Sequence, residues 1–164
     1  MSVIHARVAL IEAEEDIRKL LAKALLRHGY QVSTFASAEE FLGSDGLARL
    51  LEFDVVVLDY QMVEMNGQEL CQRIKAVRPE LPVIIESGMP GREFIGECLK
   101  AGANRVLTKP FSVEELLATI HAVLPTVDIK KITAPSVSDV IEEAVASAVL
   151  DVVEEAIGLA DDDD

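Results

Sequence analysis

Two hydrophobic patterns alternate along the first 125 residues of the chain. Short runs in which most positions are apolar or β-branched are typical of buried strands, whereas longer segments with apolar residues three and four positions apart are typical of helices. The pattern predicts strands at Arg7–Ile11, Gln31–Phe35, 54–59, 82–86 and 105–107. It predicts helices at 14–28, 37–51, 67–78, 91–101 and 112–124, the second of which is interrupted at Gly43 and Gly46.

The helical segments also predict their own ends and inner faces. Ser37 and Ser112 are each followed three residues later by a glutamate, a spacing typical of a capping box at a helix start. Gly29 is a natural stop for the first helix. We expect two apolar stripes to face the core, namely Ile17, Leu20, Leu21, Ala24 and Leu25 in the first helix and Leu70, Cys71, Ile74 and Val77 in the third.

The succession of five strand–helix pairs favours an α/β fold, a parallel sheet covered by helices on both faces. In such sheets the functional site lies beyond the carboxyl ends of the strands, where the strand order switches. The residues that end the predicted strands are Glu12, Ala13, Asp59, Ser87 and Lys109. We therefore expect these residues to meet at one edge of the sheet.

The chemistry of this set points to phosphoryl transfer. Asp59 can attack phosphorus as a nucleophile and form an acyl phosphate. That reaction needs positive charge around the phosphoryl oxygens, which Lys109 can supply directly and neighbouring acids can supply by holding Mg²⁺. Ser87 can donate a hydrogen bond to a phosphoryl oxygen. Each residue taken singly is more often a cap, a turn residue or a surface group, so the prediction depends on their combined order and spacing.

Composition and charge restrict the other classes of function. Half of the 164 residues are hydrophobic but only 4% are aromatic, so we expect an aliphatic core. The net charge of −14 argues against non-specific binding to nucleic acid or to an anionic membrane. We find neither an apolar run near 18 residues nor a signal peptide, and we expect a cytoplasmic protein. Cys71 and Cys98 have no metal-binding or redox spacing, and we expect them to be buried free thiols.

The negative charge is concentrated after Pro125. Residues 1–125 hold 18 acidic and 13 basic residues, a net charge of −5, and residues 126–164 hold 11 acidic and 2 basic residues, a net charge of −9. We expect a domain at 1–125, a linker at 126–135, an amphipathic helix at 136–160 and an acidic tail at 161–164. The apolar stripe of that helix is rich in Val and Ile, which are only fair helix formers. We therefore expect the helix to be marginally stable when it is isolated in water. Three packing partners stay open: its own domain, a second copy in a homodimer, or another protein.

The segments that carry the strand-end residues resemble the receiver domain of two-component response regulators. Residues 55–67, VVVLDYQMVEMNG, are similar to the phosphoacceptor strand and its following loop. Residues 82–88, PVIIESG, are similar to the strand with the switch hydroxyl, and residues 101–111, AGANRVLTKPF, to the segment with the invariant lysine and its proline. Residues 35–42, FASAEEFL, resemble in particular the receivers of nitrogen-fixation-type regulators. The resemblance extends from about residue 6 to residue 124.

This resemblance implies a flavodoxin-like sheet with the strand order 2-1-3-4-5. It implies that Asp59 accepts a phosphoryl group from a histidine kinase or a phosphotransfer protein. Lys109 would contact the phosphoryl group, and Ser87 would be the switch hydroxyl. Mg²⁺ would bind to Glu12, Asp59 and the backbone carbonyl of Gln61. The output would pass through contacts with a downstream protein.

The first strand departs from the family where the metal ion would bind. The family usually has two adjacent acids after this strand, and here Glu12 and Ala13 occupy those positions. Because Ala13 has no ligating atom, we expect Mg²⁺ affinity to fall by at least about tenfold. Glu14 could compensate, but it begins the helix and we expect it to face solvent.

Three other departures concern the loop and the later strands. Val63 stands where the family usually has proline, and Val106 stands where it usually has a rotating Tyr or Phe. Without that ring, the resemblance does not imply the usual coupling of phosphorylation to the face formed by the fourth helix and the fifth strand. Glu86 is unusual at the end of a buried strand, and we expect it to reach solvent.

Three hypotheses follow from these residues. In the first, a receiver without enzymatic activity of its own accepts phosphate on Asp59 and signals through protein contacts. In the second, Ala13 and Val106 mark a pseudo-receiver, an interaction or dimerisation module that does not depend on phosphorylation. In the third, the chain is a small phosphatase-like enzyme with an aspartate nucleophile. Gln61 disfavours the third hypothesis because a second catalytic acid would be expected two residues after Asp59.

Overall fold

The computed structural model describes residues 6–43, 46–89 and 91–125. The strands are β1 Arg7–Ile11, β2 Gln31–Phe35, β3 Val55–Asp59, β4 Val83–Ser87 and β5 Arg105–Thr108. The helices are α1 Glu15–Arg27, α2 Ala38–Leu42, α3 Gly46–Arg49, α4 Gly67–Val77, α5 Arg92–Lys100 and α6 Val113–Val123, with a 3₁₀ turn at Leu50–Glu52. The linker, helix and tail predicted between residues 126 and 164 lie outside the described residues.

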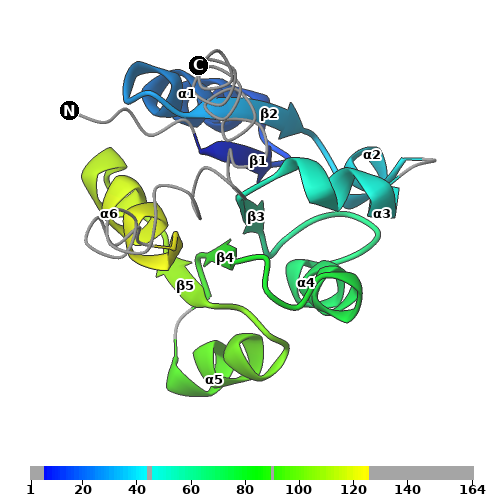
Figure 1. The fold of residues 1–164 in the computed structure, drawn as a ribbon. Helices are drawn as coiled ribbons and strands as arrows, with labels where there is room; N and C mark the ends of the chain where they lie inside the picture. The colour runs from blue at the N-terminus through cyan, green and yellow to red at the C-terminus, as the bar shows by residue number, and fades with distance from the viewer. Residues whose placement is uncertain (1–5, 44–45, 90, 126–164) are drawn as a thin grey trace, which may run out of the picture. The chain divides into compact units, whose positions relative to one another are not determined.

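The five strands form one parallel sheet in the order β2-β1-β3-β4-β5 (Figure 1). This is the flavodoxin-like order that the resemblance implied. The chain first adds β2 on one side of β1 and then crosses to add β3 on the other side. The order therefore switches between β1 and β3, and the carboxyl ends of these two strands are where a site is expected.

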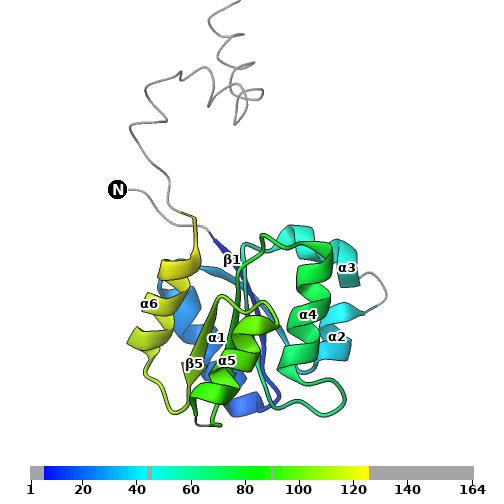
Figure 2. The same cartoon turned by 90° about the horizontal axis from the view of Figure 1, so that it is seen from below.

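The helices cover the two faces of the sheet unequally (Figures 1 and 2). Side chains alternate between the faces along each strand. Val8, Leu10, Val57 and Ile84 belong to the apolar cluster that also contains residues of α1 and α6. Ala9, Ile11, Leu58 and Ile85 belong to the cluster that contains residues of α2, α4 and α5. Along each strand, alternate residues therefore face one cluster or the other. This alternation decides the side of the sheet on which each strand-end residue lies.

Local capping signals account for several helix starts. Ser112 and Glu115 form the complete capping box predicted from their spacing, and Asn66 and Glu69 form a second one that the sequence reading missed. The Ser37 hydroxyl accepts the N–H of Glu40 as predicted, but the Glu40 carboxylate accepts the N–H of Ala36 rather than that of Ser37. These contacts fix the chain as it leaves a strand or loop and enters a helix.

Some predicted burial is wrong. Leu20 is 59% exposed and Val77 is 49% exposed, although both continue an apolar stripe in the sequence. Each lies at the margin of its stripe, and the centre of the stripe faces the sheet while this margin faces solvent. Cys71 and Cys98 are buried free cysteines, as predicted, and burial raises the pKa of the Cys71 thiol to about 11.

Candidate functional site

Three of the predicted strand-end side chains meet at the carboxyl edge of the sheet. Asp59 ends β3, Glu12 follows β1, and Lys109 follows β5. The Lys109 Nζ lies 3.2 Å from Asp59 Oδ1 and 3.9 Å from Glu12 Oε1. Glu12 and Asp59 are only 1% and 5% exposed. A single ammonium group therefore bridges two nearly buried carboxylates.

Backbone contacts hold Asp59 at the end of β3. The N–H of Gln61 donates to Asp59 Oδ1 over 3.3 Å. Tyr60 is held on two sides, since its N–H donates to the Glu86 carbonyl and its carbonyl accepts the N–H of Gly67. Gly67 is required at this position because a Cβ there would lie 2.7 Å from the Tyr60 Cα and 2.9 Å from the Asp59 carbonyl oxygen. The start of α4 therefore packs directly against the backbone of the acceptor residue.

The Glu12 carboxylate accepts a hydrogen bond at one of its two oxygens only, among the described residues. Its Oε2 accepts the N–H of Glu14, and its Oε1 has no hydrogen-bond partner among the described residues. Burial raises the pKa of Glu12, and the charge of Asp59 adds to this effect. Ala13 and Glu14 are both exposed, as expected for Glu14, and Arg18 donates to the backbone carbonyls of Glu12 and Ala13. Ala13 thus accepts a hydrogen bond from the Arg18 guanidinium through its backbone carbonyl, and it supplies no carboxylate to the site.

The charge of Lys109 is stabilised by its neighbours. Burial lowers the pKa of its ammonium group, but Asp59, Glu12 and Glu86 outweigh that effect and raise the pKa above its ordinary value. The N–H of Lys109 donates to the Ser87 carbonyl over 2.9 Å, which fixes the start of the segment after β5. Lys109 is therefore a fixed positive charge beside Asp59 at neutral pH.

Ser87 lies at the same edge but is not joined to the other side chains. It is buried, and its Oγ accepts the N–H of Met89 over 2.9 Å. Within the described residues no hydrogen bond joins its hydroxyl to Asp59 or Lys109. By strand parity its side chain lies on the opposite face from Asp59, the face covered by α2, α4 and α5.

Glu86 overturns the expectation of a solvent-reaching strand end. It is 0% exposed, and neither carboxylate oxygen has a hydrogen-bond partner among the described residues. Burial raises its pKa to about 8, and the charge of Glu12 adds to that effect while Lys109 opposes it. The strand runs one residue later than predicted, from Val83 to Ser87 instead of 82–86, so Glu86 lies inside it and not at its end. The available signal was an acid within the apolar sequence VIIES.

The region of Val106 has an aromatic contact from another position. Val106 is partly buried against the core on the α4 and α5 side of the sheet. On the same side, Tyr60 packs edge-on against Phe94 of α5, with ring centroids 4.8 Å apart and an interplanar angle of 88°. Val63, in the loop before α4, is 90% exposed. The residue directly after Asp59 thus contacts α5 through an aromatic ring.

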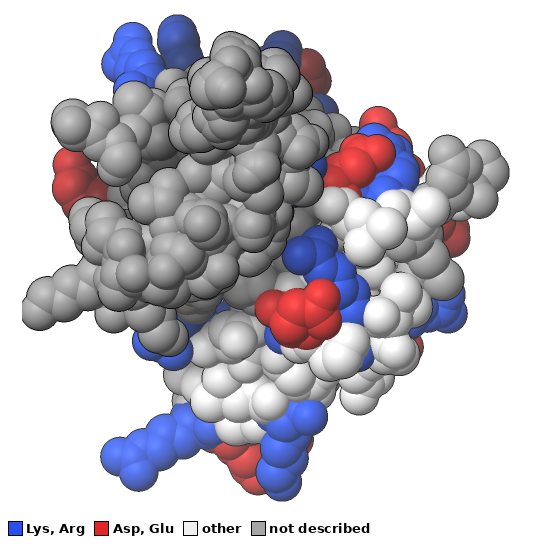
Figure 3. Space-filling model, viewed as in Figure 1, with Lys and Arg blue, Asp and Glu red and all other residues white. Residues whose placement is uncertain are grey.

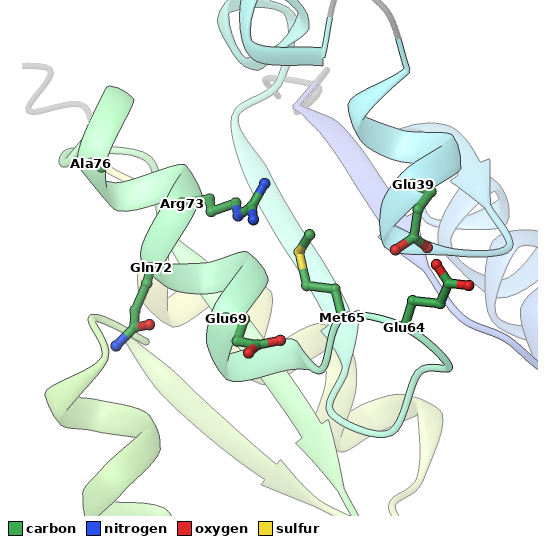
Figure 4. Close-up of a pocket in the computed structure, with 7 residues that line it drawn as sticks. All are labelled: Glu39, Glu64, Met65, Glu69, Gln72, Arg73 and Ala76. Carbon is green, nitrogen blue, oxygen red and sulfur yellow. The ribbon is translucent and has the colours of Figure 1, made fainter.

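A hollow of the described surface lies away from Asp59. An open pocket of about 610 Å³ is formed by α2, α4 and the loop between β3 and α4 (Figure 4). It is lined by Glu39, Glu64, Met65, Glu69, Gln72, Arg73 and Ala76. None of the strand-end residues contributes to it, so its size does not identify the chemical site. On the face in Figure 3, acidic and basic side chains of the described residues are interspersed.

Comparisons with known proteins agree with this fold. The sequence model of the response regulator receiver domain family matches residues 8–121. The cell cycle response regulator CtrA of Brucella ovis is 35% identical over 118 residues, which cover 72% of this chain and 50% of that protein. The BeF3-activated receiver domain of DrrB is 34% identical with a TM-score of 0.65, over 73% of this chain and 97% of that one. The chemotaxis protein CheY4 of Vibrio cholerae is 29% identical with a TM-score of 0.65, over 74% of this chain and all of that one (100%).

A parallel five-stranded sheet that brings an aspartate and a lysine together at its carboxyl edge defines a class of α/β signalling domain. The chain belongs to the response regulator receiver domain family, as its two-component resemblance implied. The particular likeness to nitrogen-fixation-type regulators stays a prediction. The chain spans about half the length of the curated relatives it matches (50%). Among the described residues, we find no helix long and apolar enough to span a membrane.

The residues at the edge fit the Mg²⁺ ion that the family implies. Glu12 and Asp59 provide carboxylate oxygens, which Mg²⁺ prefers, and the backbone of Gln61 lies in the loop beside Asp59. Glu12 Oε1 is buried without a donor, so it is free to act as a ligand. A bound Mg²⁺ would neutralise charge on phosphoryl oxygens. In the described part of the chain, no three Asp, Glu, His or Cys side chains are already arranged as a metal cluster.

Proposed function

We propose that this receiver accepts a phosphoryl group on Asp59 from a histidine kinase or a phosphotransfer protein. The observation that carries the proposal is the contact of 3.2 Å between Lys109 Nζ and Asp59 Oδ1 at the switch point of the sheet. A buried carboxylate next to a fixed ammonium group combines a nucleophile with a charge that can stabilise phosphoryl oxygens.

The contacts of Asp59 also support an assignment of its two oxygens. Both contacts described for this carboxylate, from Lys109 and Gln61, go to Oδ1. Oδ2 is then the oxygen that attacks phosphorus. The new bond joins Oδ2 to phosphorus while the bond from phosphorus to the donor imidazole nitrogen breaks, and the imidazole leaves with the electron pair. The product is an acyl phosphate whose added charge lies near Lys109.

The signal then passes to another protein rather than to a small-molecule substrate. Ser87 and Lys109 are joined through a backbone hydrogen bond, so a change at one residue is transmitted to the other. A Ser87 hydroxyl that turns toward the phosphoryl group gives up its bond from Met89 N–H. This exchange would alter the loop between β4 and α5, which is exposed to a partner at Gly88 and Met89.

Phosphorylation of the purified chain tests the proposal. Acetyl phosphate and Mg²⁺ are expected to modify the wild type and not Asp59→Asn, as seen by a mobility shift on a phosphate-binding gel. Lys109→Gln should reduce modification, and Lys100→Gln, which removes a charge from the exposed end of α5, should leave it unchanged. Failure to modify the wild type under conditions that modify a second receiver would contradict the proposal.

The second candidate is a pseudo-receiver that acts as an interaction or dimerisation module without phosphorylation. Ala13 favours it, since this exposed side chain gives the cation site no oxygen. The two candidates differ in their response to Asp59→Asn. Loss of the cellular function in this variant supports the phosphoryl acceptor, whereas full retention supports the pseudo-receiver.

A further inference from the structure

Three neighbouring strands each have a carboxylate at or next to their carboxyl end, on one face of the sheet. Asp59 pairs directly with Glu86 in the register of β3 and β4, and Ile11 pairs with Leu58 in the register of β1 and β3. Glu12 follows Ile11 as Asp59 follows Leu58. Because side chains alternate along a strand, these acids lie above Leu10, Val57 and Ile84, which share one apolar cluster. The sheet therefore carries a row of carboxylates, Glu12, Asp59 and Glu86.

Among the described residues, few hydrogen-bond donors or positive charges compensate the negative charge of this row. Glu12 Oε1 and both oxygens of Glu86 are buried without any hydrogen-bond donor. Lys109 contacts Asp59 and Glu12, but no ion pair within 4.0 Å joins it to Glu86 among the described salt bridges. Burial of an unpaired carboxylate is strongly unfavourable, and the acid is retained at equilibrium only with a proton or a cation.

A structural role does not explain a glutamate at position 86. Its neighbour across the register in β5 is Leu107, and its neighbour on the same face of β4 is Ile84. A leucine or methionine would fill this place without an unsatisfied group, and such replacements of buried charges are often neutral or stabilising. The acid therefore points to a positively charged ligand at the site.

We propose that Glu86 is a carboxylate of the divalent cation site and supplies from β4 the negative charge that Ala13 does not supply from β1. The inference rests on the proposed function only for the identity of the cation as Mg²⁺. With Glu86, the three carboxylates balance the charge of Lys109 and one divalent cation. Without it, Glu12 and Asp59 leave the site with an excess positive charge.

Glu86 does not need to be an inner ligand for this role. The three acids are not already arranged as a metal cluster. Mg²⁺ usually keeps several of its water molecules in proteins, so a carboxylate can act on it through a bound water. Glu86 also pairs directly with Asp59 in the register of β3 and β4, which places it beside a residue of the cation site. Through either kind of contact, Glu86 would add negative charge to the cation site.

Metal titration of the full chain tests this inference without a phosphoryl donor. Mn²⁺, which prefers oxygen ligands as Mg²⁺ does, can be followed by electron paramagnetic resonance, and Mg²⁺ by calorimetry. Glu86→Gln keeps the shape of the side chain and removes its charge, and we expect it to weaken binding at least about tenfold. Glu97→Gln, which removes one charge from the exposed face of α5, is the matched control and should bind as the wild type does.

Two further variants keep the test informative if Glu86→Gln alters the fold. Glu86→Leu should weaken binding to a similar degree while folding in the absence of metal. Ala13→Asp combined with Glu86→Gln should restore binding toward the wild-type affinity, because the carboxylate is returned from β1. Binding by both Glu86 variants within about twofold of the wild type would overturn the inference, as would no binding by the wild type. Absence of phosphorylation together with Glu86-dependent metal binding would overturn only the proposed function.

Discussion

Glu86 pairs with Asp59 across β3 and β4, so that two carboxylates lie side by side on one face of the sheet. The pairing gives the acceptor residue a buried acidic neighbour as well as the ammonium of Lys109. After burial and the charge of Glu12, the charge of Asp59 also raises the pKa of Glu86. The stability of the protein and its response to cations are therefore linked at this point.

The metal-free protein is expected to lose stability as the pH rises. Glu86 has an ordinary pKa of 4.5 and a folded-state pKa of about 8. Between these values the folded state keeps a proton that the unfolded chain has lost, so unfolding releases a proton and its free energy falls with increasing pH. Glu12, whose pKa is also raised, acts in the same direction. The loss that Glu86 causes across this window is on the order of 4 kcal/mol.

Urea unfolding in EDTA across this pH range measures the effect. Glu86→Gln should show a flatter profile than the wild type and greater stability at the alkaline end. Glu97→Gln, whose side chain is exposed, should follow the wild type. Parallel profiles for the wild type and Glu86→Gln would show that Glu86 does not hold this proton.

Lys109→Met is expected to destabilise the metal-free fold. The change removes the ammonium group that contacts Asp59 and Glu12 and leaves these nearly buried acids without it. We expect a loss of about 1–3 kcal/mol, below that of a fully buried pair because Lys109 is partly exposed. Thermal unfolding measures it, with Lys100→Met as the exposed control. An unchanged melting temperature at alkaline pH, where the acids are ionised, would contradict the role of this ion pair.

Gly67→Ala, at the start of α4, should disturb β3, the strand that carries Asp59. The added Cβ would lie 2.7 Å from the Tyr60 Cα, 2.8 Å from the Leu58 Cδ1 and 2.9 Å from the Asp59 carbonyl oxygen. Since two of these atoms belong to the backbone, α4 must shift, and we expect a loss of about 1–3 kcal/mol. Chemical denaturation measures this loss.

Gly96→Ala is the matched control for that substitution. Gly96 lies within α5, and a Cβ there would meet nothing within 4 Å. Alanine should stabilise the helix by up to about 1 kcal/mol. Equal effects of the two substitutions would show that the close approach of α4 to β3 is not required.

The ring of Tyr60 is expected to link the acceptor strand to α5. Tyr60→Leu removes the edge-to-face contact with Phe94 and should cost about 0.5–1.5 kcal/mol beyond the loss of buried area. Tyr60→Phe keeps the ring and should retain the coupling. A double-mutant cycle with Phe94→Leu, followed by thermal unfolding, isolates this pairwise energy. Additive single effects would exclude a direct coupling between the two rings.

Local sequence signals determined most of the secondary structure. The alternation of apolar runs and helical stripes predicted all five strands and the positions of the helices, with bounds that differ by only a few residues. The same signals predicted that Glu12, Asp59 and Lys109 meet, because the ends of parallel strands share one edge. The order of the strands came from the family resemblance, since apolar periodicity carries no information about which strands are neighbours.

Only the tertiary structure decided the environment of Glu86 and the exposure of Leu20 and Val77. A residue's burial depends on the neighbouring strands and on the rotation of each helix, neither of which is encoded in the spacing of a single segment. Glu86 is enclosed because β3 and β5 flank its strand and helices cover the sheet. The sequence by itself therefore determined which acids reach this edge of the sheet, and tertiary packing determined which of them lost contact with water.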